Sequence, residues 1–136
     1  MNLADGKLER LNAFINSSAV VAEIAGADIA EPAYKAAMYD ENGNVAVATD
    51  GAKAFGLILG NTPGPIAKGR QVDVLIKDIG LLEAGGGIAK GDPVTVNASG
   101  QGTKAAKGDF IFGWAFTGAA SGECAQVQIS RSGHMG

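Results

Sequence analysis

Short apolar runs, separated by turn residues, fill the chain from residue 19 onward. Eight such runs occur, at residues 19–24, 33–39, 44–49, 54–60, 71–80, 92–98, 109–118 and 124–130. Several alternate apolar with polar residues, which is typical of strands that have one buried and one exposed face. Their spacing is typical of sandwiches and barrels. The sequence therefore predicts an all-β fold, a compact single-domain β-barrel or sandwich of about eight short strands.

The apolar positions of these runs predict the hydrophobic core. We expect it to include Val20, Ile24, Val45, Val47, Leu57, Leu59, Val72, Val74, Val94, Val96, Ile111, Trp114 and Val127. The alternating aromatic residues between Phe110 and Phe116 are also expected to be mainly core, with a ligand groove as the alternative.

Glycine punctuates the chain and discourages helices. The 21 glycines recur every few residues, and each would destabilise a helix interior by about 1 kcal/mol relative to alanine. Several follow a turn-favouring residue, as in Asn42-Gly43, Asp50-Gly51 and Ser99-Gly100. Such pairs supply the positive φ that tight turns between strands require.

The first 18 residues differ from the rest of the chain. Leu8, Leu11, Phe14 and Ile15 recur at three- and four-residue spacings, which places them on one face of a helix. A helix this short is marginal in water unless it docks on something. We therefore expect an N-terminal arm or short helix over residues 1–18, a β domain over 19–130 and a flexible tail over 131–136.

A weak internal repeat occurs at a constant offset of 57 residues. Five residues of the first half match five of the second: Gly43, Ala48, Gly51, Phe55 and Gly56 match Gly100, Ala105, Gly108, Phe112 and Gly113. Both true duplication and chance remain open, because the matches are mostly glycine and alanine. In either case the pattern favours two similar β units in one core.

Charge and composition argue against several classes of partner. The chain has 11 Lys and Arg against 14 Asp and Glu, so it lacks the positive excess that binds phosphates, and we expect no nucleic-acid partner. No apolar run approaches the roughly 20 residues that span a bilayer, and the N-terminus lacks the order of a signal peptide. A single cysteine cannot form an internal disulfide. We expect a soluble, unexported protein without membrane contact.

Candidate catalytic and metal-binding residues are sparse. The only histidine, His134, lies two residues from the end, and Cys124 sits in an alternating strand without a basic neighbour, which predicts a buried apolar role. The Asp40 segment begins like a calcium loop but has Val45 where that loop needs glycine.

Two further patterns are equally weak. The glycine-rich stretch at residues 85–92 lacks the Lys-Ser/Thr of a phosphate loop. The carboxylate pairs Asp73 with Asp78 and Asp92 with Asp109 fit a solvated surface better than a glycosidase site. We therefore predict no enzyme activity and no catalytic, cofactor or metal site.

Four segments together carry a family resemblance. They are DGAKAFGLILGNT (50–62), KGRQVDVLIKDIG (68–80), AGGGIAKGDPVTVNASGQGTKA (84–105) and GWAFTGAASGECAQVQI (113–129). Because these segments occur in this order, the chain resembles the capsid decoration proteins of tailed bacteriophages, which are also called cement or head stabilisation proteins.

The resemblance implies a non-enzymatic virion structural protein. A β domain of this kind, often a homotrimer, is made in the host cytoplasm, binds the major capsid protein on the capsid exterior and stabilises the shell. Family members often contact the shell through an N-terminal arm. That implies capsid-binding roles here for Leu3, Leu8, Leu11 and Phe14, although this segment precedes the resembling region.

A second resemblance suggests an alternative function. The segment IAKGDPVTV (88–96) is similar to β-clip modules, which implies a ligand-binding module, for instance for a carbohydrate. A lattice binder should present a flat face of apolar or small residues, whereas a ligand module should present a concave pocket lined by aromatic residues.

Overall fold

The chain folds entirely into β-structure where it is described. The computed structural model describes residues 18–61 and 64–136, and in these ranges it forms ten strands and no helix. The strands are β1 (Val20–Ile24), β2 (Ala36–Tyr39), β3 (Val45–Val47), β4 (Gly56–Ile58), β5 (Gln71–Leu75), β6 (Ile79–Glu83), β7 (Pro93–Val96), β8 (Gly102–Lys104), β9 (Phe110–Ala115) and β10 (Cys124–His134). The predicted all-β class is confirmed.

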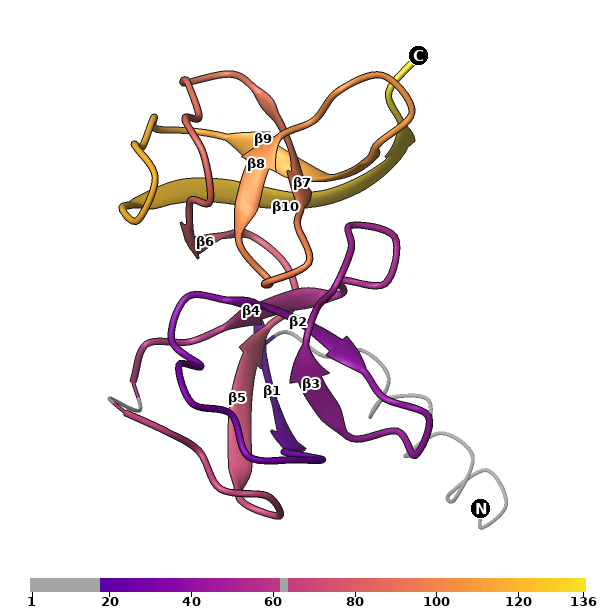
Figure 1. Ribbon diagram of the computed structural model, residues 1–136, viewed down its shortest axis with the longest axis vertical. Coiled ribbons are helices and arrows are strands. Elements are labelled where there is room, and N and C mark those ends of the chain that lie inside the picture. The colour runs from indigo at the N-terminus through magenta and orange to yellow at the C-terminus, as the bar shows by residue number, and fades with distance from the viewer. Residues whose placement is uncertain (1–17, 62–63) are drawn as a thin grey trace, which may run out of the picture.

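These strands form two five-stranded antiparallel sheets. The N-terminal sheet has the order β1-β5-β4-β2-β3, and the C-terminal sheet has the order β6-β10-β9-β7-β8. Figure 1 shows the two sheets as two lobes stacked along the long axis of the molecule. The chain completes the first lobe before it enters the second, so each sheet is formed by one continuous half of the sequence.

The two halves are structural repeats of each other. Replacing β1 to β5 by β6 to β10 converts one strand order into the other. An offset of 57 residues carries β2 and β3 onto β7 and β8, and it carries the pair Ala37–Val47 onto the pair Val94–Lys104. An offset of 59 carries β1 onto β6, and an offset of 53 carries β5 onto residues 124–128 of β10. The weak sequence repeat therefore corresponds to a duplicated fold.

Equivalent turns in the two repeats use the same hydrogen bonds. Asp40 Oδ1 accepts bonds of 2.9 and 3.0 Å from the backbone N–H groups two and four residues later, and Asn97 Oδ1 does the same at 2.9 and 3.0 Å. Gly43 and Gly100 follow with φ of +79° and +76°. The Asp40 carboxylate thus holds a β-hairpin turn, as Asn and Asp side chains commonly do.

A shared core joins the repeats. Ala36, Leu57 and Leu75 of the N-terminal sheet lie in one buried cluster with Leu82 and Val127 of the C-terminal sheet. One face of the first sheet is thus covered by the second sheet. A further buried cluster lies on the other face of the N-terminal sheet and contains Ala25, Ile29, Ala37, Val45, Ile58, Ile66, Val72 and Val74.

Loops from each lobe reinforce this contact. The turn before β8 reaches the N-terminal sheet, where Ala36 N donates to Gly100 O at 2.8 Å. In the opposite direction, the loop after β3 reaches the C-terminal sheet, where Arg131 Nη2 donates to Ala52 O at 2.6 Å. Figure 1 shows both loops crossing the boundary between the lobes.

Most of the predicted core residues are buried. Val45, Leu57, Val72, Val74, Val94, Val96, Ile111 and Val127 are buried, and Val20, Val47 and Leu59 are half-buried. Two of the predicted positions are wrong: Ile24 is 46% exposed and Trp114 is 38% exposed. Ile24 ends the edge strand β1, and Trp114 lies at an exposed position of the C-terminal sheet.

The strand boundaries also differ from the expected ones. The run at 71–80 is not one strand, because the chain breaks at Asp78 with φ of +68° and passes from β5 into β6. The short strand β8 was not expected at all. Finally, β10 continues to His134, so residues 131–134 belong to a strand and not to the expected tail.

Gly43 and Gly100 occupy equivalent turns, but alanine should destabilise the protein more at Gly100 than at Gly43. A Cβ at Gly100 would lie 2.2 Å from Val47 Cγ1, whereas one at Gly43 would meet nothing within 4 Å. Gly43→Ala should lower the free energy of unfolding by about 1–2 kcal/mol, because alanine is unfavourable at positive φ. Gly100→Ala should cost about 1–3 kcal/mol more through overpacking. Urea unfolding of both variants measures the difference. Equal unfolding midpoints would show that the packing of the Gly100 turn against Val47 does not stabilise the contact between the repeats.

Candidate functional site

The expected capsid-binding residues Leu3, Leu8, Leu11 and Phe14 lie outside the described residues. Their role stays a prediction. The structure does show where this segment joins the β domain, because Ile76 N donates to Ala19 O at 2.8 Å. The segment therefore leaves the domain beside the link between the two repeats.

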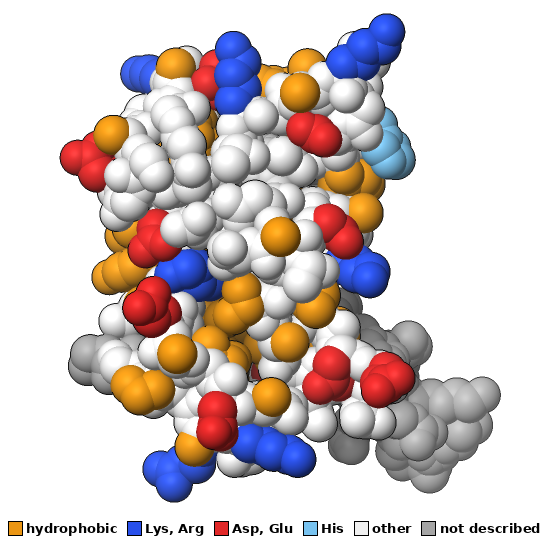
Figure 2. Space-filling view, in the orientation of Figure 1, with side chains coloured by type: hydrophobic (Ala, Val, Ile, Leu, Met, Phe, Trp, Pro, Cys, Tyr) orange, Lys and Arg blue, Asp and Glu red, His pale blue; other side chains and the backbone are white. Residues whose placement is uncertain are grey.

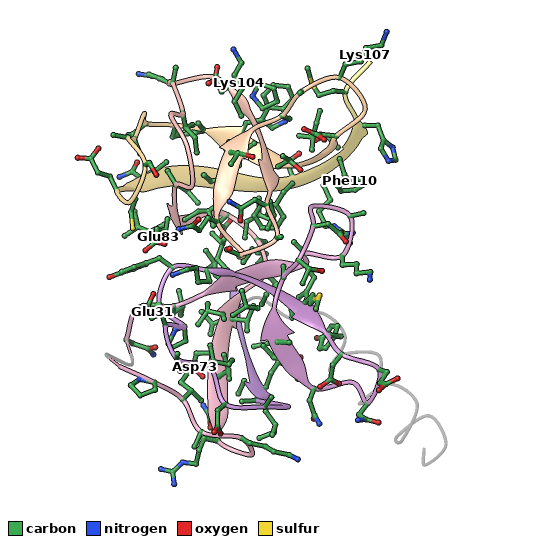
Figure 3. All side chains as sticks on the ribbon, viewed as in Figure 1. Glu31, Asp73, Glu83, Lys104, Lys107 and Phe110 are labelled. Atoms are coloured by element: carbon green, nitrogen blue, oxygen red, sulfur yellow. The ribbon has the colours of Figure 1, made fainter. Side chains whose placement is uncertain are left out.

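A buried ion pair lies at the boundary of the two repeats. The Lys35 side chain is 9% exposed, and its Nζ lies 3.1 Å from Glu83 Oε2. Gln101 Nε2 donates to the same oxygen at 2.6 Å. Glu83 is further fixed by its backbone N–H, which donates to Tyr34 O at 2.8 Å. Figure 3 shows Glu83 at the junction of the lobes.

These contacts stabilise the ionised form of Glu83. The hydrogen bond from Gln101 and the ammonium group of Lys35 hold the pKa of the Glu83 carboxyl below its usual value, although partial burial opposes them. A charged lysine this deeply buried depends on its carboxylate partner, because an unpaired buried charge is strongly destabilising. The three side chains are therefore best explained as a structural link between the repeats.

A groove of about 500 Å³ opens beside this ion pair. Its polar lining consists of Asp28, Glu31, Lys35, Glu83, Ser99 and Gln101, and the rest is made of small or aliphatic residues. Of the described residues, none that lines it is aromatic. The groove thus lacks the aromatic lining that we expect of a carbohydrate-binding module.

One side of the C-terminal sheet carries four exposed apolar side chains. Ile79 and Leu81 of β6, with Trp114 of β9 and the adjacent Phe116, are between 38% and 45% exposed. The β10 residues Gln128 and Gln126 lie between them: Gln128 pairs with both Ile79 and Trp114, and Gln126 pairs with Leu81. Phe116 N donates to Gln126 O at 2.7 Å. We call these six residues the open face.

Cys124 and His134, the candidate nucleophile and base, both lie in surroundings that do not activate them. Burial, together with the nearby negative charge of Glu83, raises the pKa of the Cys124 thiol, which disfavours the reactive thiolate. His134 packs edge-on against the Phe110 ring with centroids 5.3 Å apart. Both contacts are typical of residues with a structural role.

The carboxylates considered as pairs serve separate local structures. Asp73 accepts bonds from Asn61 Nδ2 and Gln71 Nε2, and these bonds hold the pKa of its carboxyl below the usual value. Asp92 Oδ2 and Asp109 Oδ2 each accept a backbone N–H three residues earlier, at 2.8 and 2.9 Å. Such bonds are typical of turns.

The remaining features to consider in the described residues are surface charge, potential metal sites and potential membrane spans. On the side seen in Figure 2, basic and acidic side chains are interspersed. Over residues 18–61 and 64–136, no three His, Cys, Asp or Glu side chains are grouped to hold a metal ion. The same ranges contain no helix long and apolar enough to cross a membrane.

Comparison with known protein families assigns the chain to one of them. A sequence profile described as "Structural cement protein (E217 gp24/Pam3 gp6)", a family of phage cement proteins, matches residues 6–130. The chain belongs to this phage cement family. Membership makes it a structural, capsid-associated component of a phage particle, and the predicted resemblance is confirmed. No curated protein matches it.

A solved structure supports the fold of this cement protein. The chain is similar to the head fiber gp8.5 N base of bacteriophage phi29, with a TM-score of 0.66 and 21% sequence identity. The alignment covers 86% of this chain and 98% of the other. At this identity the similarity concerns the fold.

Sequence reasoning missed the open face. Trp114 and Phe116 were expected to be core residues, and the predicted run 71–80 contained Ile79 but ended before Leu81. One signal was available, because Trp114 and Phe116 alternate with Gly113 and Ala115. Two aromatic residues opposite two small ones show that the strand has two different faces, but not which of them is covered.

The ion pair predicts a pH dependence of stability. Because the pKa of Glu83 is lowered in the folded state, its contribution is present above the ordinary value of 4.5 and is lost as pH falls through the lowered value. Glu83→Gln should cost about 1–3 kcal/mol at pH 7 and should lose less stability than the native protein on acidification. Urea unfolding from pH 7 to pH 3 measures both effects.

The control for this experiment is Glu31→Gln. Glu31 is an exposed acid on the same groove, so this variant makes the same charge change without altering the ion pair. It should follow the native pH profile. If Glu83→Gln also follows that profile, the ion pair does not link the repeats in the way described.

Proposed function

We propose that this chain binds the outer surface of a phage capsid and stabilises the shell, with no reaction of its own. The observation that carries the proposal is the family match over residues 6–130. In this proposal the partner is the major capsid protein, the location is the capsid exterior after synthesis in the host cytoplasm, and neither nucleic acid nor membrane is bound.

The proposed shell contact is the N-terminal arm, through Leu3, Leu8, Leu11 and Phe14. Their spacing supports this role because one helical face would gather them, and the family match begins at residue 6, within the arm. Fixing the backbone of one residue opposes binding by about 1–2 kcal/mol of free energy, and burying one large apolar side chain favours it by about 1.5–3 kcal/mol. One arm should therefore bind weakly, and several arms on one oligomer should bind well.

We further propose that the subunits form a homotrimer. Closed symmetry would present several arms to the lattice at once, and it would cover sheet edges that otherwise invite uncontrolled pairing. The many small side chains support it, because they allow two chains to approach closely.

Deleting residues 1–18 should leave the β domain folded and abolish or greatly weaken capsid attachment. The test mixes purified protein with capsids that lack it and measures the fraction that cosediments. A full-length Lys7→Gln/Glu9→Gln variant, which changes polar residues of the same segment, should bind nearly as the native protein does. Undiminished binding by the truncated protein would move the docking surface to the β domain.

Light scattering at micromolar concentration should give three times the chain mass of 13.7 kDa. The reason is that the arms act together only in a preformed oligomer. A monomer mass under these conditions would contradict the proposed trimer, while leaving the capsid-binding experiment to be judged separately.

A further inference from the structure

We propose that the open face is the surface through which copies of this chain associate with each other. This inference rests on the self-association in the proposed function and names the residues that mediate it: Ile79, Leu81, Trp114, Phe116, Gln126 and Gln128. It follows from a comparison of the two repeats.

Equivalent faces of the two sheets differ in how far they are buried. In the N-terminal sheet, the strand register places Val20, Leu75, Leu57 and Ala36 in one row across β1, β5, β4 and β2. The equivalent row across β6, β10, β9 and β7 is Ile79, Gln128, Trp114 and Pro93. The first row packs into the core between the repeats. The second row has no third repeat above it.

Large apolar side chains are nevertheless exposed on this side of the C-terminal sheet. Six large apolar side chains are exposed in the described residues, and four of them are on the open face: Ile79, Leu81, Trp114 and Phe116. The other two, Ile24 and Tyr39, lie on the N-terminal repeat. Scattered exposed apolar residues are ordinary, but four of them gathered on one side of one sheet favour an interaction surface.

The charge of this surface favours a second copy as its occupant. The six residues include no ionisable side chain, although the chain as a whole has a formal charge of −3. Interfaces between different proteins commonly use opposite charges to select the partner. A neutral face can meet its own copy without like-charge repulsion.

The arrangement of the six residues is also self-complementary. Gln126 and Gln128 lie in a central row on β10, with apolar side chains on β6 and β9 at either side. A glutamine amide both donates and accepts hydrogen bonds. Around the three-fold axis of the proposed trimer, the glutamine rows of the copies can therefore bond to one another while the flanking apolar side chains are buried.

Trp114 makes this proposal directly measurable, because it is the only tryptophan of the chain. Sedimentation of the full chain over a concentration series gives the dissociation constant for self-association, and tryptophan emission over the same series reports whether the open face is covered. Dilution that separates the copies should shift the emission to longer wavelength.

Leu81→Lys and Ile24→Lys form a matched pair of variants. Each replaces a residue of an edge strand, the first strand of its repeat, and the native side chains are 42% and 46% exposed. Leu81→Lys should raise the dissociation constant about tenfold or more, as expected for an anchor residue. Ile24→Lys should associate like the native protein. Urea unfolding of both variants checks that each is folded.

Several results would overturn the proposal. If Leu81→Lys forms the same oligomer with the same affinity, the subunits associate elsewhere and the proposed trimer is unaffected. A native monomer with solvent-exposed tryptophan would remove self-association altogether. A native monomer with shielded tryptophan would mean that the chain's own N-terminal segment covers the face. If Leu81→Lys instead loses only capsid binding, the open face contacts the shell.

Discussion

The fold depends on the burial of one face of the N-terminal sheet beneath the C-terminal sheet. Leu57 and Leu75 have no comparable cover within their own repeat, and they are almost fully buried because the second repeat lies over them. A unit as short as residues 20–75 is near the lower limit for independent stability, since domains of about 60 residues bury only about 60% of their unfolded surface. Stacking two such units produces one core large enough for both.

This close stacking explains part of the unusual composition. A Cβ at Gly80 would lie 2.4 Å from the Leu75 side chain and 2.9 Å from that of Leu57, so any larger residue there would displace the leucine methyl groups that fill the space between the sheets. At the boundary, a buried lysine is matched by Glu83 and Gln101. Small residues and one fixed polar cluster thus make the two repeats a single β block, a form suited to a protein that braces a shell.

The sequence predicted the local structure well because alternation and turn chemistry are local properties. The runs around Val45, Leu57 and Val94 became strands, and the turn at Asn42-Gly43 formed as expected. The break at Asp78 was not predicted, because Asp tolerates positive φ but adopts it too rarely to mark a break by itself. The duplication was visible only weakly, since a single offset of 57 aligns β2 to β4 while β1 and β5 need offsets of 59 and 53.

The candidate surfaces were harder to predict because they depend on tertiary packing. Alternation places Trp114 on one side of its strand, but the sequence does not show that nothing covers that side. Lys35, Glu83 and Gln101 are far apart in the chain, and only the stacking of the repeats brings them together. The family resemblance was recognised from the order of glycine-rich segments, which is a property of the whole chain and is not tied to any one site.

A cryo-electron microscopy reconstruction of capsids decorated with this protein would show which of its surfaces are in contact with other chains. We expect the chain to lie on the outside of the shell, its first 18 residues to contact the major capsid protein, and the face carrying Trp114 to be covered by another copy. Density that leaves this face open to solvent, or that places it against the shell, would contradict the proposed arrangement.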